Sequence, residues 1–307
     1  MSRTLKALII GGSFCLLGLI IFFIGYHFND NRLDNIISFE ATKEDPLILK
    51  KYESVKPSSL GIINITTKRM PVTIKSHDED YLMLEYYENQ DQLFEVLESN
   101  GKLFLKKKDT SFLKEFITSN VLAYIKKDLV SGIILHIPSS YKGELIVNTT
   151  FGDISIPDSL AFNQIRKIDF KNTFADINLK SLSGTTLNLK TTRGNIDCSD
   201  IRFKNITLIA SNATVHFDYI ESDNIDIVSN KSTIEGTNIL SSNLNLDAKS
   251  SKSRLSLWEY SSQYSVEVNK TGNSDVNILE SILEDLPKRL TIKASDSTIR
   301  IFFSRDK

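Results

Sequence analysis

A row of polar side chains in the second half of the chain has the spacing of a ligand-binding ladder. Asp153, Asp176 and Asn195 each stand directly before an isoleucine that opens a short stretch of alternating apolar residues. If these stretches stack at the strand spacing of ~4.8 Å, two carboxylates and an amide would line up and could hold Ca²⁺ or grip a polysaccharide. A polysaccharide lyase would also need a neighbouring base, and Arg193 is the one candidate that adjoins the row. The competing interpretation is that Asp and Asn only begin turns at these positions.

The other residues capable of chemistry are scattered. The four histidines have no partner at a spacing that would complete a zinc site; they are His27, His77, His136 and His216. The acidic run at 78–80 falls where a turn between strands is expected, so we interpret it as a solvated turn. The sequence contains no nucleophile elbow, phosphate-binding glycine loop or calcium-binding EF-hand loop. It therefore predicts no enzyme activity, no cofactor and no metal site.

The polar row belongs to an internal repeat that begins at Glu144. Eight units each contain an apolar alternating pair, a short polar corner and a second alternating pair. The second pair opens at Ile154, Ile177, Ile196, Val215, Ile234, Leu255, Val276 and Ile299. These residues are 19 to 23 positions apart. A repeat of about 20 residues is the length of one rung in a stacked structure, not of a domain.

Alternation within each unit places its apolar residues on one face of two short strands. In most units the first apolar residue and its counterpart after the corner are nine positions apart, as Leu145 and Ile154 are. The same step occurs upstream, from Ile63 to Val72, which predicts a ninth, N-terminal rung. We therefore predict an all-β fold, a β-solenoid of stacked two-strand rungs of about 20 residues. An antiparallel sandwich is the alternative, because it too has short alternating strands.

The region between the N-terminal rung and the main array has a different pattern. Longer strands are predicted at 81–87, 93–97 and 103–107. They are followed by an amphipathic helix at 113–125. We interpret this stretch as an insertion whose helix covers an open end of the solenoid.

The endings of several units resemble those of a bacterial putative-adhesin family of unknown function. They read Gly-Asp-Ile-Ser-Ile at 152–156, Ala-Asp-Ile-Asn-Leu at 175–179 and Gly-Asn-Ile-Asp at 194–197. The apolar stretch at 132–138, which ends in proline, looks like the strand that precedes the array in that family. The similarity covers roughly residues 58–303, and the N-terminal segment is similar to that of LiaG-type members linked to envelope stress in Gram-positive bacteria. The resemblance implies an extracytoplasmic β-solenoid without catalytic residues.

The N-terminal segment has the length and the flanking charges of a membrane anchor. Residues 7–26 carry no charge, and about 20 apolar residues at ~1.5 Å rise cross a ~30 Å hydrocarbon core. Arg3 and Lys6 precede this segment, whereas Arg32 is the only Lys or Arg at positions 27–41. This asymmetry predicts a cytoplasmic N-terminus and an extracytoplasmic C-terminal region. A cleavable signal peptide is the alternative, but no small-x-small site follows.

The same segment offers a surface to another helix. Gly11, Gly18 and Gly25 fall on one stripe, which would let a second copy or another membrane protein approach closely. The simpler explanation is that glycine is frequent in membrane helices. Elsewhere, 37 Lys and Arg against 38 Asp and Glu give a net charge of −1, which lacks the basic excess of a nucleic-acid-binding protein.

These features predict four segments and a binding role. The segments are a cytoplasmic tip and transmembrane anchor at 1–26, a stalk at 27–57, the N-terminal rung with its insertion at 58–143, and the repeat array at 144–307. We predict a single-pass protein of the bacterial cell membrane whose extracytoplasmic solenoid binds a cell-wall polymer or a membrane protein, in envelope stress or surface adhesion. The alternative is a carbohydrate-active, lyase-like enzyme on a β-helix scaffold, which a groove gathering the polar row and Arg193 would favour.

Overall fold

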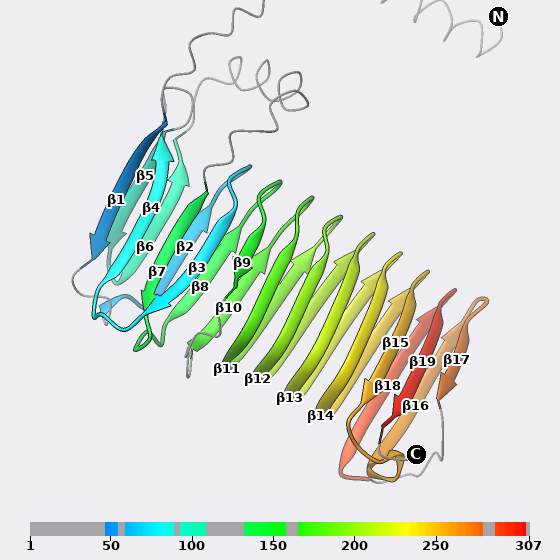
Figure 1. Cartoon of the computed structure of the whole chain (residues 1–307). Coiled ribbons are helices and arrows are strands. Elements are labelled where there is room, and N and C mark those ends of the chain that lie inside the picture. The colour runs from blue at the N-terminus through cyan, green and yellow to red at the C-terminus, as the bar shows by residue number, and fades with distance from the viewer. Residues whose placement is uncertain are drawn as a thin grey trace, which may run out of the picture. The chain divides into compact units, whose positions relative to one another are not determined.

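The computed structural model describes residues 47–54, 59–88, 93–108, 132–157, 165–278 and 286–304. Contacts divide the chain into two units, and the described strands all lie in the second, Ile48–Lys307, where they form one 19-stranded sheet (Figure 1). The strands are β1 Ile48–Ser54, β2 Ile62–Thr66, β3 Val72–His77, β4 Leu82–Glu88, β5 Phe94–Ser99, β6 Lys102–Lys107, β7 Ile133–Pro138, β8 Glu144–Asn148, β9 Ile154–Ile156, β10 Ile165–Lys171, β11 Ile177–Thr191, β12 Ile196–Ser211, β13 Thr214–Asn230, β14 Thr233–Lys249, β15 Lys252–Leu257, β16 Tyr264–Thr271, β17 Asp275–Ile278, β18 Lys288–Ser295 and β19 Thr298–Phe303. The all-β prediction is confirmed.

The middle of the sheet is a parallel stack with a constant register. Strands β11 to β14 pair in parallel, and Ile177, Ile196 and Val215 face one another, each one repeat after the last. The first part of β11 continues the row of β9 and its second part continues the row of β10, so each long strand completes one unit and begins the next (Figure 1). The inward side chains of both rows are apolar and buried. This parallel, solenoid-like stacking rules out the antiparallel sandwich for the array.

The corners between the two strands of a unit are closed by backbone contacts and small polar side chains. A Cβ atom built on Gly194 would overlap the carbonyl oxygen of Ala175 in the preceding unit, so the close stacking of corners requires glycine there. Later units carry a buried serine at the equivalent position, and its hydroxyl accepts a backbone N–H of the preceding unit. The hydroxyl of Ser232 accepts the N–H of Ala213 at 3.2 Å, and the hydroxyl of Ser251 accepts the N–H of Ser232 at 3.2 Å.

The stack continues toward the N-terminus beyond the first unit of the main array. Strand β2 lies between β8 and β6, and β3 lies between β9 and β7, with every pairing parallel. Ile63 faces Leu145 and Val72 faces Ile154, so the predicted N-terminal rung is confirmed. Strands β6 and β7 form a further unit, although both lie in the segment predicted as an insertion.

Antiparallel strands cover this end of the stack. Strand β4 runs antiparallel to β7, β5 to β6 and β1 to β4. The strands expected at 81–87, 93–97 and 103–107 are confirmed as β4, β5 and β6. Strand β1 falls within the predicted stalk, so residues 48–54 of that segment belong to the sheet. The change of strand direction ends the parallel register that the units share.

The last two units of the repeat are stacked in the reverse of their sequence order. Strand β18 lies between β14 and β16, and β19 lies between β15 and β17. The inserted unit carries four fully buried aliphatic residues, Leu290, Ile292, Ile299 and Ile301. The outer unit carries four partly buried ones, Val266, Val268, Val276 and Ile278. Placing the larger side chains inside buries more apolar surface, which explains why the expected order is wrong.

One position in the sixth unit also corrects the expected repeat. Ile234 faces Ser253 in the next unit, and the residue predicted for this place, Leu255, faces Gly236. Ser253 is buried, at 4% exposure, so a serine occupies a place where an apolar residue was expected. The apolar pattern pointed to Leu255 because alternate residues on a strand share one face.

Two predicted helices lie outside the described residues. They are the membrane anchor at 7–26, with Gly11, Gly18 and Gly25, and the amphipathic helix at 113–125. Within the part of the chain that the structure describes, no helix is long and apolar enough to cross a membrane.

Candidate functional site

The predicted polar row exists, but its side chains are used to join the units. The Oδ1 atom of Asp153 accepts the backbone N–H of Asp176 at 2.9 Å, and the Oδ1 atom of Asp176 accepts the backbone N–H of Asn195 at 2.7 Å. Each carboxylate therefore satisfies a backbone donor at the next corner, where no sheet partner is available. This geometry favours a turn role over a calcium site. Among the described residues, no group of three or more His, Cys, Asp or Glu is arranged to hold a metal ion.

A row of exposed aromatic rings lies on the same corner. The rings of Phe151 and Phe174 stack with centroids 5.0 Å apart and an interplanar angle of 8°, and they are 54% and 42% exposed. The guanidinium of Arg193 lies over the ring of Phe174, 5.1 Å from its centroid. Arg193 thus faces an aromatic ring where the lyase hypothesis needed a base directed at the carboxylates. The sequence held a signal for this row, because all three residues stand two positions before Asp153, Asp176 or Asn195.

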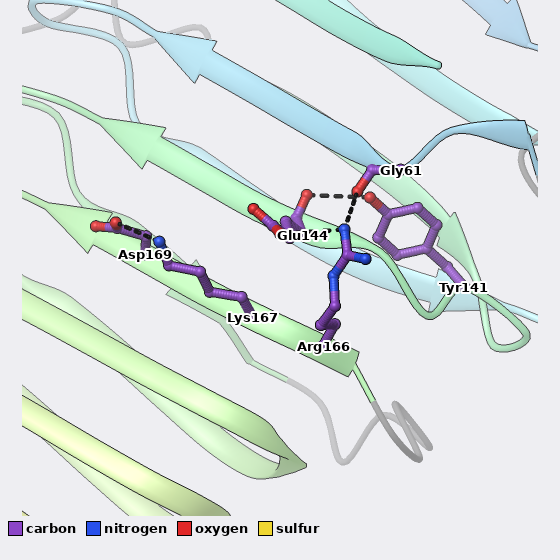
Figure 2. Close-up of polar contacts among 6 residues, drawn as sticks. All are labelled: Gly61, Tyr141, Glu144, Arg166, Lys167 and Asp169. Atoms are coloured by element: carbon purple, nitrogen blue, oxygen red, sulfur yellow. Dashed lines mark hydrogen bonds and ion pairs between the residues drawn. The ribbon is translucent and has the colours of Figure 1, made fainter.

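A second polar cluster ties β2, β8 and β10 together (Figure 2). Arg166 contacts the carboxylate of Glu144 at 3.0 Å and donates to the carbonyl oxygen of Gly61 at 3.4 Å. The hydroxyl of Tyr141 donates to the carbonyl oxygen of Glu144 at 3.0 Å. Burial raises the pKa of the Tyr141 phenol, so the group remains a hydrogen-bond donor. Because the charges are paired and each donor has an acceptor within the cluster, we interpret it as a structural contact that holds neighbouring units together.

The structure holds a groove at a third place, where the chain leaves one unit and begins the next. The groove has a volume of about 510 Å³ and is lined by residues of successive units. Its charged lining residues are Arg202, Lys204, Glu221, Asp223, Glu259 and Lys288. Ser222, Ser241 and Ser242 add hydroxyl groups, and Phe203 and Leu240 add apolar side chains, so three bases and three acids lie beside apolar surface. Neither the polar row nor Arg193 lines this groove.

The acid at one end of the groove is held in a fixed position. Glu259 is 9% exposed; its Oε1 atom is paired with the Lys288 ammonium, and its Oε2 atom accepts a hydrogen bond from the Tyr264 hydroxyl at 2.9 Å. The same hydroxyl lies 2.6 Å from the carbonyl oxygen of Ser241, and burial raises the pKa of Tyr264. The pair and the hydrogen bonds compensate the cost of burying Glu259. The sequence did not predict this site because its residues belong to different units and form no motif.

Fold and groove together define a class of protein: a repetitive all-β scaffold that presents its functional groups along a stack of rungs. The chain belongs to the Toastrack DUF4097 family, whose model matches residues 62–302. The resemblance to a bacterial putative-adhesin family of unknown function is thereby confirmed.

Three solved structures match most of the chain at low sequence identity. A putative adhesin from Bacteroides fragilis is 12% identical, with 83% of this chain and 97% of that chain covered and a TM-score of 0.52. A putative adhesin from Parabacteroides merdae is 10% identical, with 83% and 95% covered and a TM-score of 0.48. A putative lipid binding protein from Parabacteroides distasonis is 14% identical, with 82% and 96% covered and a TM-score of 0.44. A search of curated proteins found no match.

Proposed function

We propose that this chain is a membrane-tethered, extracytoplasmic protein of the bacterial cell envelope that binds a surface polymer or a membrane-protein partner without catalysing a reaction. The groove carries the proposal, because charged and hydroxyl side chains from successive units line one open channel on a stacked scaffold. Its lining side chains come from aligned positions of successive units, such as Arg202, Glu221 and Leu240, and this arrangement along the stack suits an extended ligand. Surface adhesion and envelope stress are the settings in which we expect this binding to act.

The tether is supported by the sequence at the N-terminus. The uncharged run at 7–26 is long enough to span a bilayer, and Arg3 and Lys6 favour a cytoplasmic N-terminus. A reporter that folds only outside the cytoplasm should be active when fused after Lys307. A reporter that works only in the cytoplasm should be silent at the same position, and the opposite pattern would contradict the topology.

The non-catalytic part of the proposal is supported by the positions of the residues that a lyase would use. Asp153 and Asp176 each accept a backbone N–H, and Arg193 packs on Phe174. We therefore expect envelope polysaccharides to keep their chain length when they are incubated with the protein. Shortened products, absent from a heat-denatured control, would contradict this expectation.

Binding can be tested by reversing acidic charges in the groove. The full-length protein, in detergent micelles, should sediment with isolated envelope material, and replacing both Glu221 and Asp223 by Lys should weaken this sharply. The matched control makes the same change to Lys at Glu235 and Asp247, exposed acids on β14 that do not line the groove. Equal binding by the two double variants would show that charge alone, not the groove, governs association.

A further inference from the structure

Two exposed aromatic residues are close in the sequence to residues that line the groove. The ring of Tyr219 is two positions before Glu221, and Trp258 directly precedes Glu259. Tyr219 is 54% exposed and Trp258 is 40% exposed, and their ring centroids are 6.2 Å apart at an angle of 39°. Large aromatic rings exposed next to one another are common in recognition surfaces, because contact with a ligand removes much apolar area from water.

The backbone at Tyr219 indicates that this ring does not serve the fold. The residue has a φ of +56°, in the left-handed region that bulky residues rarely adopt. The corresponding bends of neighbouring units place Ser181, Asp200 and Asn238 at φ values of +53° to +54°. Asp and Asn suit this conformation, whereas tyrosine at the same place is strained and directs its ring to solvent. A strained, exposed aromatic residue is better explained by a ligand contact than by packing.

The charges of the groove favour a neutral ligand. Arg202 lies 3.0 Å from Asp200 and 3.7 Å from Glu221, while Lys288 is paired with Glu259. Three lining bases are thus offset by three lining acids, which leaves no excess to attract an anionic polymer. A neutral sugar has hydroxyl and amide groups that donate to carboxylates and accept from guanidinium and ammonium groups. The same groove suits such groups without separating the internal pairs.

The length of the groove fits more than one sugar. Arg202, Glu221 and Leu240 face one another on β12, β13 and β14, and Glu259 follows in the next unit. Three steps at the strand spacing of ~4.8 Å make roughly 14 Å, which is the scale of an oligosaccharide. The volume of about 510 Å³ lies within the range of small-ligand sites.

We propose that this groove binds a neutral glycan, with sugar faces packed on Tyr219 and Trp258 and hydroxyl or amide groups bonded to Arg202, Glu221 and Glu259. This inference rests on the proposed binding function and names its ligand class. The ligand contacts the aromatic pair at the rim and the fixed carboxylate of Glu259 at the end of the groove. The internal salt bridges remain in place when the glycan is bound.

Trp258 is an intrinsic fluorescence probe of this site, because it is the only tryptophan of the chain. The full-length protein in micelles is titrated with chitotetraose, a neutral oligosaccharide of N-acetylglucosamine, and tryptophan emission is recorded. We expect a saturable blue shift as the indole leaves water. Tetragalacturonate, an anionic oligosaccharide of equal length, should give no saturable change.

Two variants assign the signal to the groove. Tyr219→Asn removes the ring and matches Asn238, so the fold should keep its stability while the Kd for chitotetraose rises about tenfold. Phe151→Asn, at a residue with the same 54% exposure on another corner, should leave the Kd unchanged. Equal Kd values for both variants, or saturation by tetragalacturonate alone, would overturn the inference.

The same experiments separate this inference from the proposed function. If chitotetraose gives no response but sedimentation with envelope material still depends on Glu221 and Asp223, the ligand class is wrong and the binding function stands. If neither depends on the groove, both are wrong.

Discussion

The buried face of the array can be tested at two adjacent residues. Ile196 is 1% exposed and lies between Ile177 and Val215 in the stack, so an aspartate there would face apolar side chains on both sides. Losing the buried isoleucine costs about 2–3 kcal/mol, and an unpaired buried carboxylate adds about 3–5 kcal/mol. The sum is comparable to the total stability of many domains, about 5–15 kcal/mol. We therefore expect Ile196→Asp to unfold the array.

Asn195→Ala is the matched control. The backbone N–H of Asn195 donates to Asp176, and alanine keeps that donor, so the free energy of unfolding should change by less than about 1 kcal/mol. Urea unfolding followed by circular dichroism measures both variants in the full-length protein. A similar loss of stability in the two variants would show that the assignment of the two faces is incorrect. A folded Ile196→Asp protein would refute the burial argument itself.

Three further outcomes are expected. Gly194→Ala should destabilise the protein by about 1–3 kcal/mol in urea unfolding, because its Cβ would overlap the Ala175 carbonyl, while Ala175→Gly should cost only about 1 kcal/mol. Burial lowers the pKa of His136 below 6.5, so the folded state resists protonation and the free energy of unfolding should fall as pH drops below that value. His136→Gln should flatten this part of the acid-unfolding curve, and an unchanged curve would contradict the assignment. Replacing the three anchor glycines, Gly11, Gly18 and Gly25, by Leu should preserve membrane insertion and reduce crosslinking to a partner helix. Unchanged crosslinks would mean that the stripe does not mediate association.

The regular part of the fold follows from the sequence because two independent periods agree. Alternation fixes which face of each strand is buried, and the 19-residue spacing of Ile177, Ile196 and Val215 fixes the register between them. The nine-residue step from Ile63 to Val72 was sufficient to find a unit far from the main array. Such patterns are informative because a one-residue slip would expose every buried side chain of a unit.

The order of the last units depends on how well each order buries apolar surface, which no local sequence pattern shows. Both final units have acceptable strands, and only the apolar area buried by each stacking order separates the two arrangements. Ser253 shows the same limit, because stacking placed a hydroxyl inside where alternation suggested Leu255.

The candidate site was harder to foresee than the fold. The alignment of Asp153 with Asp176 followed from the repeat, but the direction of each carboxylate was decided by an unpaired backbone N–H at the next corner. The groove joins Arg202, Glu221 and Glu259 from separate units, so no contiguous motif marks it. Side-chain pairing across units is a property of the stack and is absent from any single repeat.

The end of the groove at Glu259 and Lys288 lies where the repeat is interrupted, and this position has a physical reason. Gly236 faces Leu255 and Ile239 faces Leu257, so β14 has one more residue than β15 between these two pairs. Such a bulge bends the chain and redirects the side chains that follow. Trp258 turns outward, and Glu259 is buried against Tyr264 and Lys288. This end of the groove therefore owes its buried acid to a unit that departs from the register.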